Sequence, residues 1–553
     1  MKQSPASGTA GLNTASGFRT RIQEASDALR SHLGALSTAQ PEAGKLKTYI
    51  ISVGEALACH DEIKVLRQLV RQKGFEPVPE DGGQDSIPRL RDRLQEMLSL
   101  MQNPLLRQEL HSLGGAELAR AIPELSATRK SPQAILLRRE EEKLKSSYAR
   151  LMPLPGNLQS AKAELGTVPL PRAARKKDWL DQARVWEERG DALEQLFTEL
   201  VDTRKRLALA LGFDSYAGYL AHRRRGMSWL PEQFLRLTAE ITFPLLRSLH
   251  EYRKAALGLT RLRPFDLSTR NIVGALDFPQ WRKSMERLME NVHPYFAECF
   301  RVMTREGLVD LRSAHAGTCL HLQHSRRPYV QAPAGISPKE LMAAIHEIGH
   351  GIHILFAAGQ EIPFYRGITP LSGELAALSV ELLASPHLEA FFEDPAVAAR
   401  VRRKHLEGIV AVFSTATAIE SFEEELYSKE MSAATRQKTF AGIMEKHLGL
   451  IDYTGYEAIL RTWYHRIPTL VFSPGYFLYY AVAQAGALSV CRRAGRSGEI
   501  SAEFMRFMRL GTRFTDERLY EAAGASPSAM VDSLSVEQLG KTLYDLYHAA
   551  PLT

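Results

Sequence analysis

The sequence predicts a mostly α-helical protein, and two observations support this prediction. Apolar residues recur at three- and four-residue spacing through long segments, as in residues 19–36, 179–211 and 231–257, which is typical of helices with one buried face. Alternating patterns typical of strands are few, and the best candidate covers residues 318–330. We therefore expect helices nearly throughout, with one small β element.

The length and composition fit a large globular protein. The chain has 553 residues, of which 44% are hydrophobic and 24% are charged, so it should form two or more lobes or one large helical body. The cysteines are scattered without a C-x-x-C pair, which argues against a disulfide framework and against a thiolate zinc site. They are Cys59, Cys299, Cys319 and Cys491. A reducing, cytoplasmic location fits this cysteine usage.

The sequence indicates neither a membrane nor a nucleic acid as a partner. The N-terminus is rich in Ser, Ala, Gly and Thr and lacks the apolar core of a signal peptide, so residues 1–18 are expected to be a disordered tail. No stretch approaches 18 uninterrupted apolar residues, so no membrane span is expected. The formal net charge is +7, and the basic cluster at 222–225 comes without a nucleic-acid-binding motif. We interpret that cluster as solvated surface.

The pattern H-E-x-x-H gives the strongest functional signal. It stands here as His346-Glu347-Ile348-Gly349-His350. Two imidazoles four residues apart lie on one face of a helix and can bind one zinc ion, while the glutamate beside them can reach a water molecule. Ser337 and Glu340 form a capping box with proline at the first helical position, so a helix is predicted over residues 338–357.

The same helix separates an apolar face from a histidine face. The apolar stripe consists of Leu341, Ile345, Ile348, Ile352 and Leu355. His346, His350 and His353 fall on the opposite side. Three histidines could simply be polar residues on a solvated face, but that is an unusual way to solvate a helix. We therefore expect His346 and His350 to be metal ligands and His353 to support the site or bind substrate.

A catalytic zinc site needs a third protein ligand. The next predicted helix begins near Thr369 and carries Glu374 and Glu381 on one face of an otherwise apolar sequence. A buried carboxylate needs a partner, and a metal is one. Glu374 is therefore the expected third ligand. Glu381 is the expected acceptor for a ligand imidazole, with a plain buried salt bridge as the alternative.

This pattern resembles that of the thimet oligopeptidase and oligoendopeptidase F group of zinc metallopeptidases. That group carries H-E-x-G-H-x-x-H with a glutamate ligand about 24 residues further on, as His346 to His353 and Glu374 do here. The second glutamate, Glu381, is similar to that of the oligoendopeptidase F branch. Weaker similarities flank the motif at 211–219, 263–266, 316–330 and 507–524.

The resemblance covers about residues 193–547 and implies a fold and a substrate class. The implied fold is a two-lobed helical shell around a deep substrate channel, which restricts substrates to short peptides. Breaks rich in proline and glycine at 76–88 and 152–177 suggest loops or lobe boundaries. We accordingly expect an N-terminal helical region at 19–180 and a catalytic peptidase region at 181–553.

The sequence departs from the resemblance at one position. The family usually has a histidine shortly before a tyrosine cluster, and both stabilise the tetrahedral intermediate. Thr469 stands where that histidine is expected, and His465 is the nearest histidine. The transition-state donors are therefore expected to be Tyr476 and Tyr480, with aromatic core packing as the alternative. Tyr479, in the same cluster, is expected to support the site or bind substrate.

The expected cofactor is one Zn²⁺ per chain, which lowers the pKa of a bound water to roughly 7. Glu347 is the expected general base, and it would return the proton to the leaving amine. The expected activity is cleavage of internal bonds in short peptides. A zinc exopeptidase such as a carboxypeptidase, with Arg366 or Arg326 anchoring a peptide terminus, and a non-catalytic peptide-binding protein are the alternatives.

Overall fold

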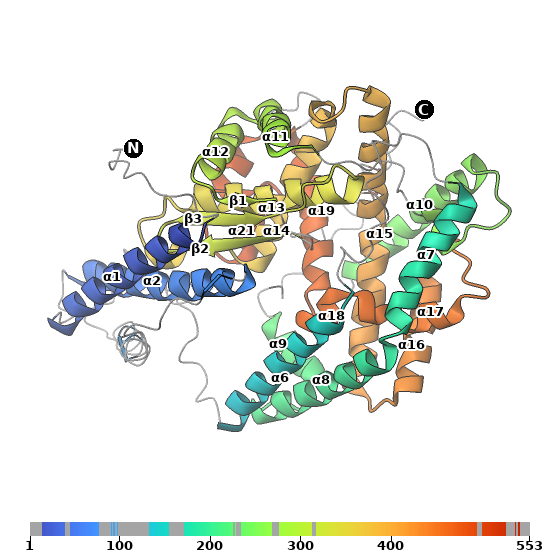
Figure 1. The fold of residues 1–553 in the computed structure, drawn as a ribbon, viewed down its shortest axis with the longest axis horizontal. Helices are drawn as coiled ribbons and strands as arrows, with labels where there is room; N and C mark the ends of the chain where they lie inside the picture. The colour runs from blue at the N-terminus through green and yellow to red at the C-terminus, as the bar shows by residue number, and fades with distance from the viewer. Residues whose placement is uncertain are drawn as a thin grey trace.

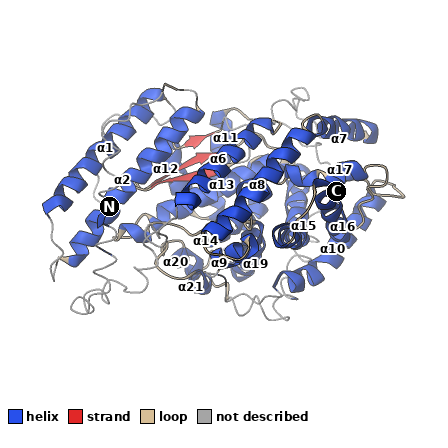
Figure 2. Cartoon of the chain, turned by 90° about the horizontal axis from the view of Figure 1, so that it is seen from below, coloured by secondary structure: helices blue, strands red, loops and turns tan. Residues whose placement is uncertain are grey.

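The computed structural model describes most of the chain. The described residues are 14–38, 45–73, 75–76, 132–153, 171–224, 227, 234–267, 276–311, 317–494 and 500–526, with isolated positions at 90, 92–93, 97, 537 and 540–541. Figure 1 shows the N-terminal helices and the small sheet on one side of the molecule, and the helices of residues 132–210 and 433–461 on the other. The mostly helical fold is therefore confirmed, and the strands form only a small patch (Figure 2).

A pair of buried helices lies at the centre of the fold. Helix α13 (Pro338–Ala357) packs against α14 (Pro370–Ala384), and α14 also packs against α19 (Phe477–Ala494). The two helices approach very closely, because a Cβ atom on Gly349 would lie only 2.9 Å from the Cα atom of Ala377. Glycine at this position therefore lets the backbones of α13 and α14 meet.

Both central helices begin where the sequence predicted. The Ser337 hydroxyl accepts a hydrogen bond from the backbone N–H of Glu340, and Pro338 occupies the first turn of α13. Thr369 and Ser372 form a capping box at the start of α14, with both hydrogen bonds at 3.0 Å. These caps fix where each helix begins, and so which side chains of α13 and α14 face each other.

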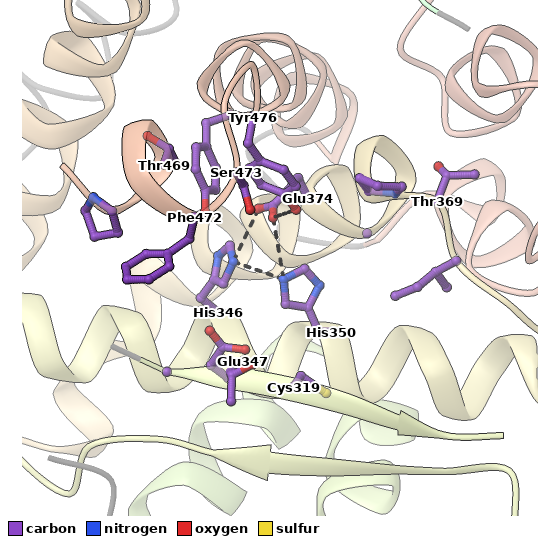
Figure 3. Close-up of a pocket in the computed structure, with 17 residues that line it drawn as sticks. Cys319, His346, Glu347, His350, Thr369, Glu374, Thr469, Phe472, Ser473 and Tyr476 are labelled. Carbon is purple, nitrogen blue, oxygen red and sulfur yellow. Dashed lines mark hydrogen bonds and ion pairs between the residues drawn. The ribbon is translucent and has the colours of Figure 1, made fainter. Parts of the chain in front are cut away.

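A small sheet covers one side of α13. Strand β3 (Arg327–Gln331) lies between β1 (Val309–Asp310), which is parallel to it, and β2 (Thr318–Leu322), which is antiparallel. The register pairs Cys319 with Val330. The β element expected at 318–330 is confirmed as β2 and β3, and β2 is the strand nearest the polar side of α13 (Figure 3).

The N-terminal helices pack outside this centre. Helices α1 (Ala15–Thr38) and α2 (Leu46–Gln72) form a hairpin, and α2 contacts β2. Residues 1–13 lie outside the described residues. The expected tail at 1–18 is wrong at its end, because Phe18 is fully buried against Phe75 and Tyr329, so α1 already begins at Ala15.

The remaining helices form the other side of the molecule and the outer layer. They include α6 (Pro132–Leu151), α7 (Arg172–Glu187), α8 (Gly190–Ala210), α9 (Tyr216–Arg223), α10 (Phe234–Ala256), α11 (Phe278–Val292), α12 (Pro294–Arg305), α15 (Pro395–Ser428), α16 (Ala433–His447), α17 (Glu457–Arg461), α18 (Pro468–Phe472), α20 (Ala502–Phe507) and α21 (Asp516–Ala522). Short 3-10 turns cover Pro264–Leu267, Pro363–Tyr365, Ser385–Ala390 and Trp463–Arg466. Among the described residues, no helix is long and apolar enough to cross a bilayer.

Two of the sequence-based boundaries fall inside α7. The loop expected at 152–177 ends earlier, since α7 begins at Arg172, and residues 154–170 lie outside the described residues. The expected boundary between residues 180 and 181 also falls within this helix. Most of the loop expected at 76–88 lies outside the described residues as well. The division into an N-terminal and a catalytic region stays a prediction.

Candidate metal centre

Three side chains from the two central helices converge on one point. His346 and His350 lie one turn apart on α13, and Glu374 faces them from α14 (Figure 3). The two Nε2 atoms are 3.1 Å apart, and His346 Nε2 lies 3.4 Å from a carboxylate oxygen of Glu374. One donor atom from each of the three residues lies within 4.8 Å of the others, so the group could hold a metal ion.

The polar atoms of this group fit a cation better than they fit one another. Glu374 Oε2 is buried and has no hydrogen-bond partner among the described residues. A buried carboxylate oxygen without a partner is costly. A metal ion would satisfy all three donors, and two histidines with one carboxylate form a ligand set that zinc accepts.

Glu381 lies behind this group and orients one of its rings. Its carboxylate accepts hydrogen bonds from His346 Nδ1 at 2.6 Å and from His405 Nε2 at 2.9 Å. Burial alone would raise the pKa of Glu381, but these two hydrogen bonds outweigh it and lower the pKa to about 2. Because Glu381 accepts the hydrogen bond from Nδ1, Nε2 is the ring atom of His346 that remains to bind a metal. The expected contact between Glu381 and a ligand imidazole is thus present.

His405, on α15, is a member of this network that the sequence analysis missed. It lies 24 residues after Glu381, on a different helix, and no local spacing connects the two. Burial lowers the pKa of His346, but the carboxylates of Glu374 and Glu381 outweigh burial and raise the pKa well above its ordinary value. Negative charge therefore lies on both edges of this imidazole, which favours a cation beside it.

Glu347 directly follows His346 on α13, and it lines the same cavity. Figure 3 shows its carboxyl group next to strand β2 and Cys319. Burial raises the pKa of Glu347 to about 7, because a charged carboxylate is poorly solvated there, and Glu374 adds to this effect. A carboxyl group with a pKa near neutrality can take up and release a proton under physiological conditions.

The cavity in front of these side chains has a volume of about 450 Å³. Its walls come from α13, α14, the start of β2 and the segment from α18 to α19. The described lining residues are Gly317, Thr318, Cys319, His346, Glu347, His350, Ile368, Thr369, Pro370, Gly373, Glu374, Pro468, Thr469, Phe472, Ser473, Tyr476 and Tyr480. No lysine or arginine is among them, so the described lining offers no cationic anchor.

The tyrosine cluster lies at the opposite wall of the cavity. The Tyr476 hydroxyl donates to Glu374 Oε1 at 2.8 Å, and Tyr480 also lines the cavity. Burial and the nearby Glu374 carboxylate raise the pKa of both phenols, so both stay protonated and can donate. Tyr479 packs against Tyr476 with ring centroids 5.2 Å apart and is not among the lining residues.

The structure places the other candidate histidines away from the cavity. His353 is buried beside Phe507, and neither of its ring nitrogens has a hydrogen-bond partner among the described residues. His465 is also buried, where it contacts the Tyr148 hydroxyl at 2.7 Å and Glu194 at 3.1 Å. Thr469 does line the cavity. A role for His353 at the site therefore stays a prediction without a direct contact to the cavity.

The arginines considered as anchors for a peptide terminus are engaged elsewhere. Arg366 is buried and pairs with Glu55 at 2.8 Å, and Arg326 reaches the same carboxylate at 3.2 Å. Within the basic cluster at 222–225, Arg224 pairs with Glu420 at 2.6 Å, whereas Arg223 is exposed. Part of the cluster expected to be solvated is therefore held in a salt bridge.

Comparison with known proteins identifies relatives by fold and not by sequence. No protein-family model matches the chain, and neither does any curated protein. A solved structure assigned as an oligoendopeptidase F has a TM-score of 0.79 at 19% identity, covering 96% of this chain and 97% of the other. Another so assigned, from Bacillus anthracis, has a TM-score of 0.72 at 18% identity, covering 96% of each chain.

A more distant structural neighbour has a different name. Metallocarboxypeptidase 1 of Trypanosoma cruzi has a TM-score of 0.53 at 14% identity, covering 91% of this chain and 99% of the other. The chain therefore has the helical fold seen in oligoendopeptidase F structures, as the resemblance implied. The same general fold is also used by a protein named as an exopeptidase.

Proposed function

We propose that this chain is a zinc metallopeptidase of the oligoendopeptidase F family that hydrolyses internal bonds of short peptides. The observation that carries the proposal is the convergence of His346, His350 and Glu374 in one cavity with the carboxyl group of Glu347. The fold similarity supports it, because structures assigned as oligoendopeptidase F superpose over almost the whole chain. A cavity of about 450 Å³ suits a short stretch of peptide.

His346, His350 and Glu374 would hold the metal. A zinc ion held there would act as a Lewis acid and make a water molecule acidic enough to lose a proton near neutral pH. Glu381 and His405 would keep the ring of His346 in the tautomer that leaves Nε2 free. The three ligands lie on buried helices whose caps and close packing fix their relative positions.

The chain's own residues supply the proton transfers. Glu347, which lines the same cavity, would accept a proton from water and pass it to the leaving amine. Tyr476 and Tyr480 would donate hydrogen bonds to the substrate carbonyl oxygen as it gains negative charge. In the chain alone the Tyr476 hydroxyl donates to Glu374, so it already points at the ligand group.

The exopeptidase alternative has specific support from the likeness to metallocarboxypeptidase 1. A carboxypeptidase needs a cation to bind the terminal carboxylate of its substrate. No lysine or arginine is among the described residues that line the cavity, and both Arg366 and Arg326 pair with Glu55. The cavity as described therefore favours endopeptidase activity.

Metal analysis combined with one peptide assay tests both parts of the proposal. The purified, undenatured protein should contain one equivalent of zinc and should cut a short peptide that is blocked at both ends. Glu374→Gln should lose the metal, whereas Glu194→Gln, a change in a partly buried carboxylate outside the cavity, should retain it. Less than about a tenth of an equivalent of any divalent metal, with no uptake of added zinc, would refute the metal centre.

Cleavage only of peptides with a free terminus would instead favour the exopeptidase. In that case the metal content would still be one equivalent, so the two parts of the proposal are separable.

A further inference from the structure

Tyr476 is carried by a tight turn and not by a long helix. Helix α18 ends at Phe472, α19 begins at Phe477, and the backbone N–H of Tyr476 donates to the carbonyl of Ser473 at 3.1 Å. Gly475, within this turn, has a φ of 79°, a conformation that glycine adopts without strain. The position of the Tyr476 hydroxyl therefore depends on what holds residues 473–476.

A buried carboxylate from another helix holds this turn. Glu423 lies on α15, and both of its carboxylate oxygens accept a hydrogen bond from the backbone N–H of Gly475, at 3.0 and 2.9 Å. Only 3% of the Glu423 side chain is exposed. A buried carboxyl group that accepts a backbone N–H with both oxygens fixes the position of that peptide group closely.

Arg224 also packs against this turn and lies close to Glu423. Its guanidinium pairs with Glu420 at 2.6 Å and lies 3.7 Å from Glu423. A Cβ atom on Gly475 would lie 2.7 Å from Arg224 Nη2, so the turn fits tightly against this side chain. Gly475 therefore lies against both the carboxyl group of Glu423 and the guanidinium group of Arg224.

The preceding helix is held in a comparable way. Arg204 is fully buried, and its guanidinium donates to the carbonyl of Leu470 at 3.0 Å and to the carbonyl of Val471. The same guanidinium pairs with Glu141 at 2.9 Å. These contacts hold the carbonyl end of α18, while Glu423 holds the turn that follows it.

The protonation of Glu423 does not remove the contact. Burial and the neighbouring Glu420 raise the pKa of Glu423 to about 8, while the Gly475 N–H and Arg224 oppose this shift. Near neutral pH the carboxyl group therefore holds a proton for much of the time. A neutral carboxyl group still has a carbonyl oxygen that can accept the N–H of Gly475.

We propose that Glu423 is a positioning residue for Tyr476. By accepting the N–H of Gly475, Glu423 holds the adjoining residue so that its phenol points at Glu374 and into the cavity. Glu423 itself is not among the cavity-lining residues, so it would act on the reaction only through the turn. This inference rests on the proposed function, in which Tyr476 donates to the substrate carbonyl.

The test compares single and double variants in a peptide-cleavage assay on the zinc-loaded full chain. Glu423→Met has a similar length but no strong acceptor, and it should lower kcat about tenfold with KM changed less than about twofold. In the Tyr476→Phe background the same change should lower kcat by less than about twofold, because the phenol it positions is already absent.

Two further variants separate positioning from general damage. Glu62→Met is the matched control, because Glu62 is also buried and accepts a backbone N–H, from Ser325 at 2.7 Å, outside the cavity. It should leave kcat within about twofold of wild type. Glu423→Gln keeps a carbonyl acceptor and should restore most of the activity that Glu423→Met loses.

Specific outcomes would contradict the inference. One is a kcat of Glu423→Met equal to that of the wild type. The other is a loss of kcat in the double variant that equals the product of the losses in Glu423→Met and Tyr476→Phe. If Glu423→Met does not fold, Glu423→Asp replaces it, since its shorter side chain withdraws the acceptor, and it must show the same dependence on Tyr476. An inactive wild-type chain that binds no metal would instead refute the proposed function, so the two failures are distinguishable.

Discussion

The two walls of the cavity are built in different ways. The wall with His346, His350 and Glu374 consists of two helices with side-chain caps at their N-termini, which pack closely at Gly349. The wall with Tyr476 consists of a five-residue helix, a turn and the start of α19. The first wall is fixed mostly by residues near one another in the sequence. The second is fixed by distant groups such as Glu423 and Arg204.

This difference matches the task that each wall has under the proposed function. Metal ligands must keep a fixed geometry, and rigid helices hold side chains more exactly than loops do. A hydrogen-bond donor stabilises the transition state when it already points at the place where charge develops. A turn held by a distant buried group such as Glu423 can fix one phenol in this way.

The largest effect is expected at the wall formed by α13 and α14 (the helical wall). Glu347→Gln keeps the shape of the side chain but cannot accept a proton, so peptide cleavage should fall at least about a hundredfold. Zinc content should stay at one equivalent, because Glu347 is not among the three converging donors. Steady-state kinetics and metal analysis of the same preparation measure both quantities. A variant that cuts peptides at the wild-type rate would exclude Glu347 as the base.

A smaller effect is expected at the wall that carries Tyr476 (the turn wall). Tyr476→Phe should lower kcat by roughly tenfold to a thousandfold, equivalent to about 1.4–4 kcal/mol, with little change in KM. Tyr480→Phe should act in the same direction, since Tyr480 lines the same cavity. Kinetics over a range of substrate concentrations separates kcat from KM. Unchanged kcat in both variants would mean that the tyrosines only pack against each other.

A third variant tests whether Glu381 supports zinc binding by holding the ring of His346. Glu381→Gln weakens the acceptor of the His346 Nδ1–H, so zinc affinity should fall by about ten- to a hundredfold. Competition with a chelator of known affinity measures this loss. The turn wall should be unaffected, so activity at saturating zinc should recover most of its wild-type value. Unchanged zinc affinity would mean that Glu381 is only part of a buried ion network with His405.

The helical wall was the part of the site that the sequence could predict. The i, i+4 spacing of His346 and His350 and the capping residues before each helix are local signals, and they gave α13 its observed bounds. Burial of α14 followed from its nearly continuous apolar sequence, which left Glu374 and Glu381 as the carboxylates needing partners.

The turn wall could not be predicted in the same way. Glu423 lies 52 residues from Gly475 and Arg204 lies 266 residues from Leu470, so no periodicity connects these pairs. His405 was missed for the same reason, because its contact with Glu381 depends on how α15 crosses α14. Such contacts are set by tertiary packing, which a single sequence does not specify residue by residue.

The smallest effect on catalysis is expected from His465, the histidine nearest in the sequence to the position where the family usually has one. His465 is buried among Tyr148 and Glu194, outside the cavity, so His465→Ala should leave kcat within about twofold of wild type. The free energy of unfolding should fall instead, by roughly 1–3 kcal/mol, because the Tyr148 hydroxyl and the Glu194 carboxylate lose their partner. Thermal or urea unfolding measures this change.

The stability of His465→Ala should also depend on pH in a way that acid unfolding can measure. Burial alone would raise the pKa of Glu194, but hydrogen bonds from His465, Tyr464 and Arg436 outweigh it and lower the pKa to about 2. A carboxylate with a lowered folded-state pKa contributes stability above its ordinary pKa of 4.5, and this contribution is lost as the pH falls toward 2. Without His465 the folded-state pKa rises, so less stability is present at neutral pH and the acid-unfolding midpoint should move to higher pH. If His465→Ala instead keeps wild-type stability and loses kcat, then His465 reaches the reaction from outside the cavity, and the turn wall is not the only source of transition-state donors.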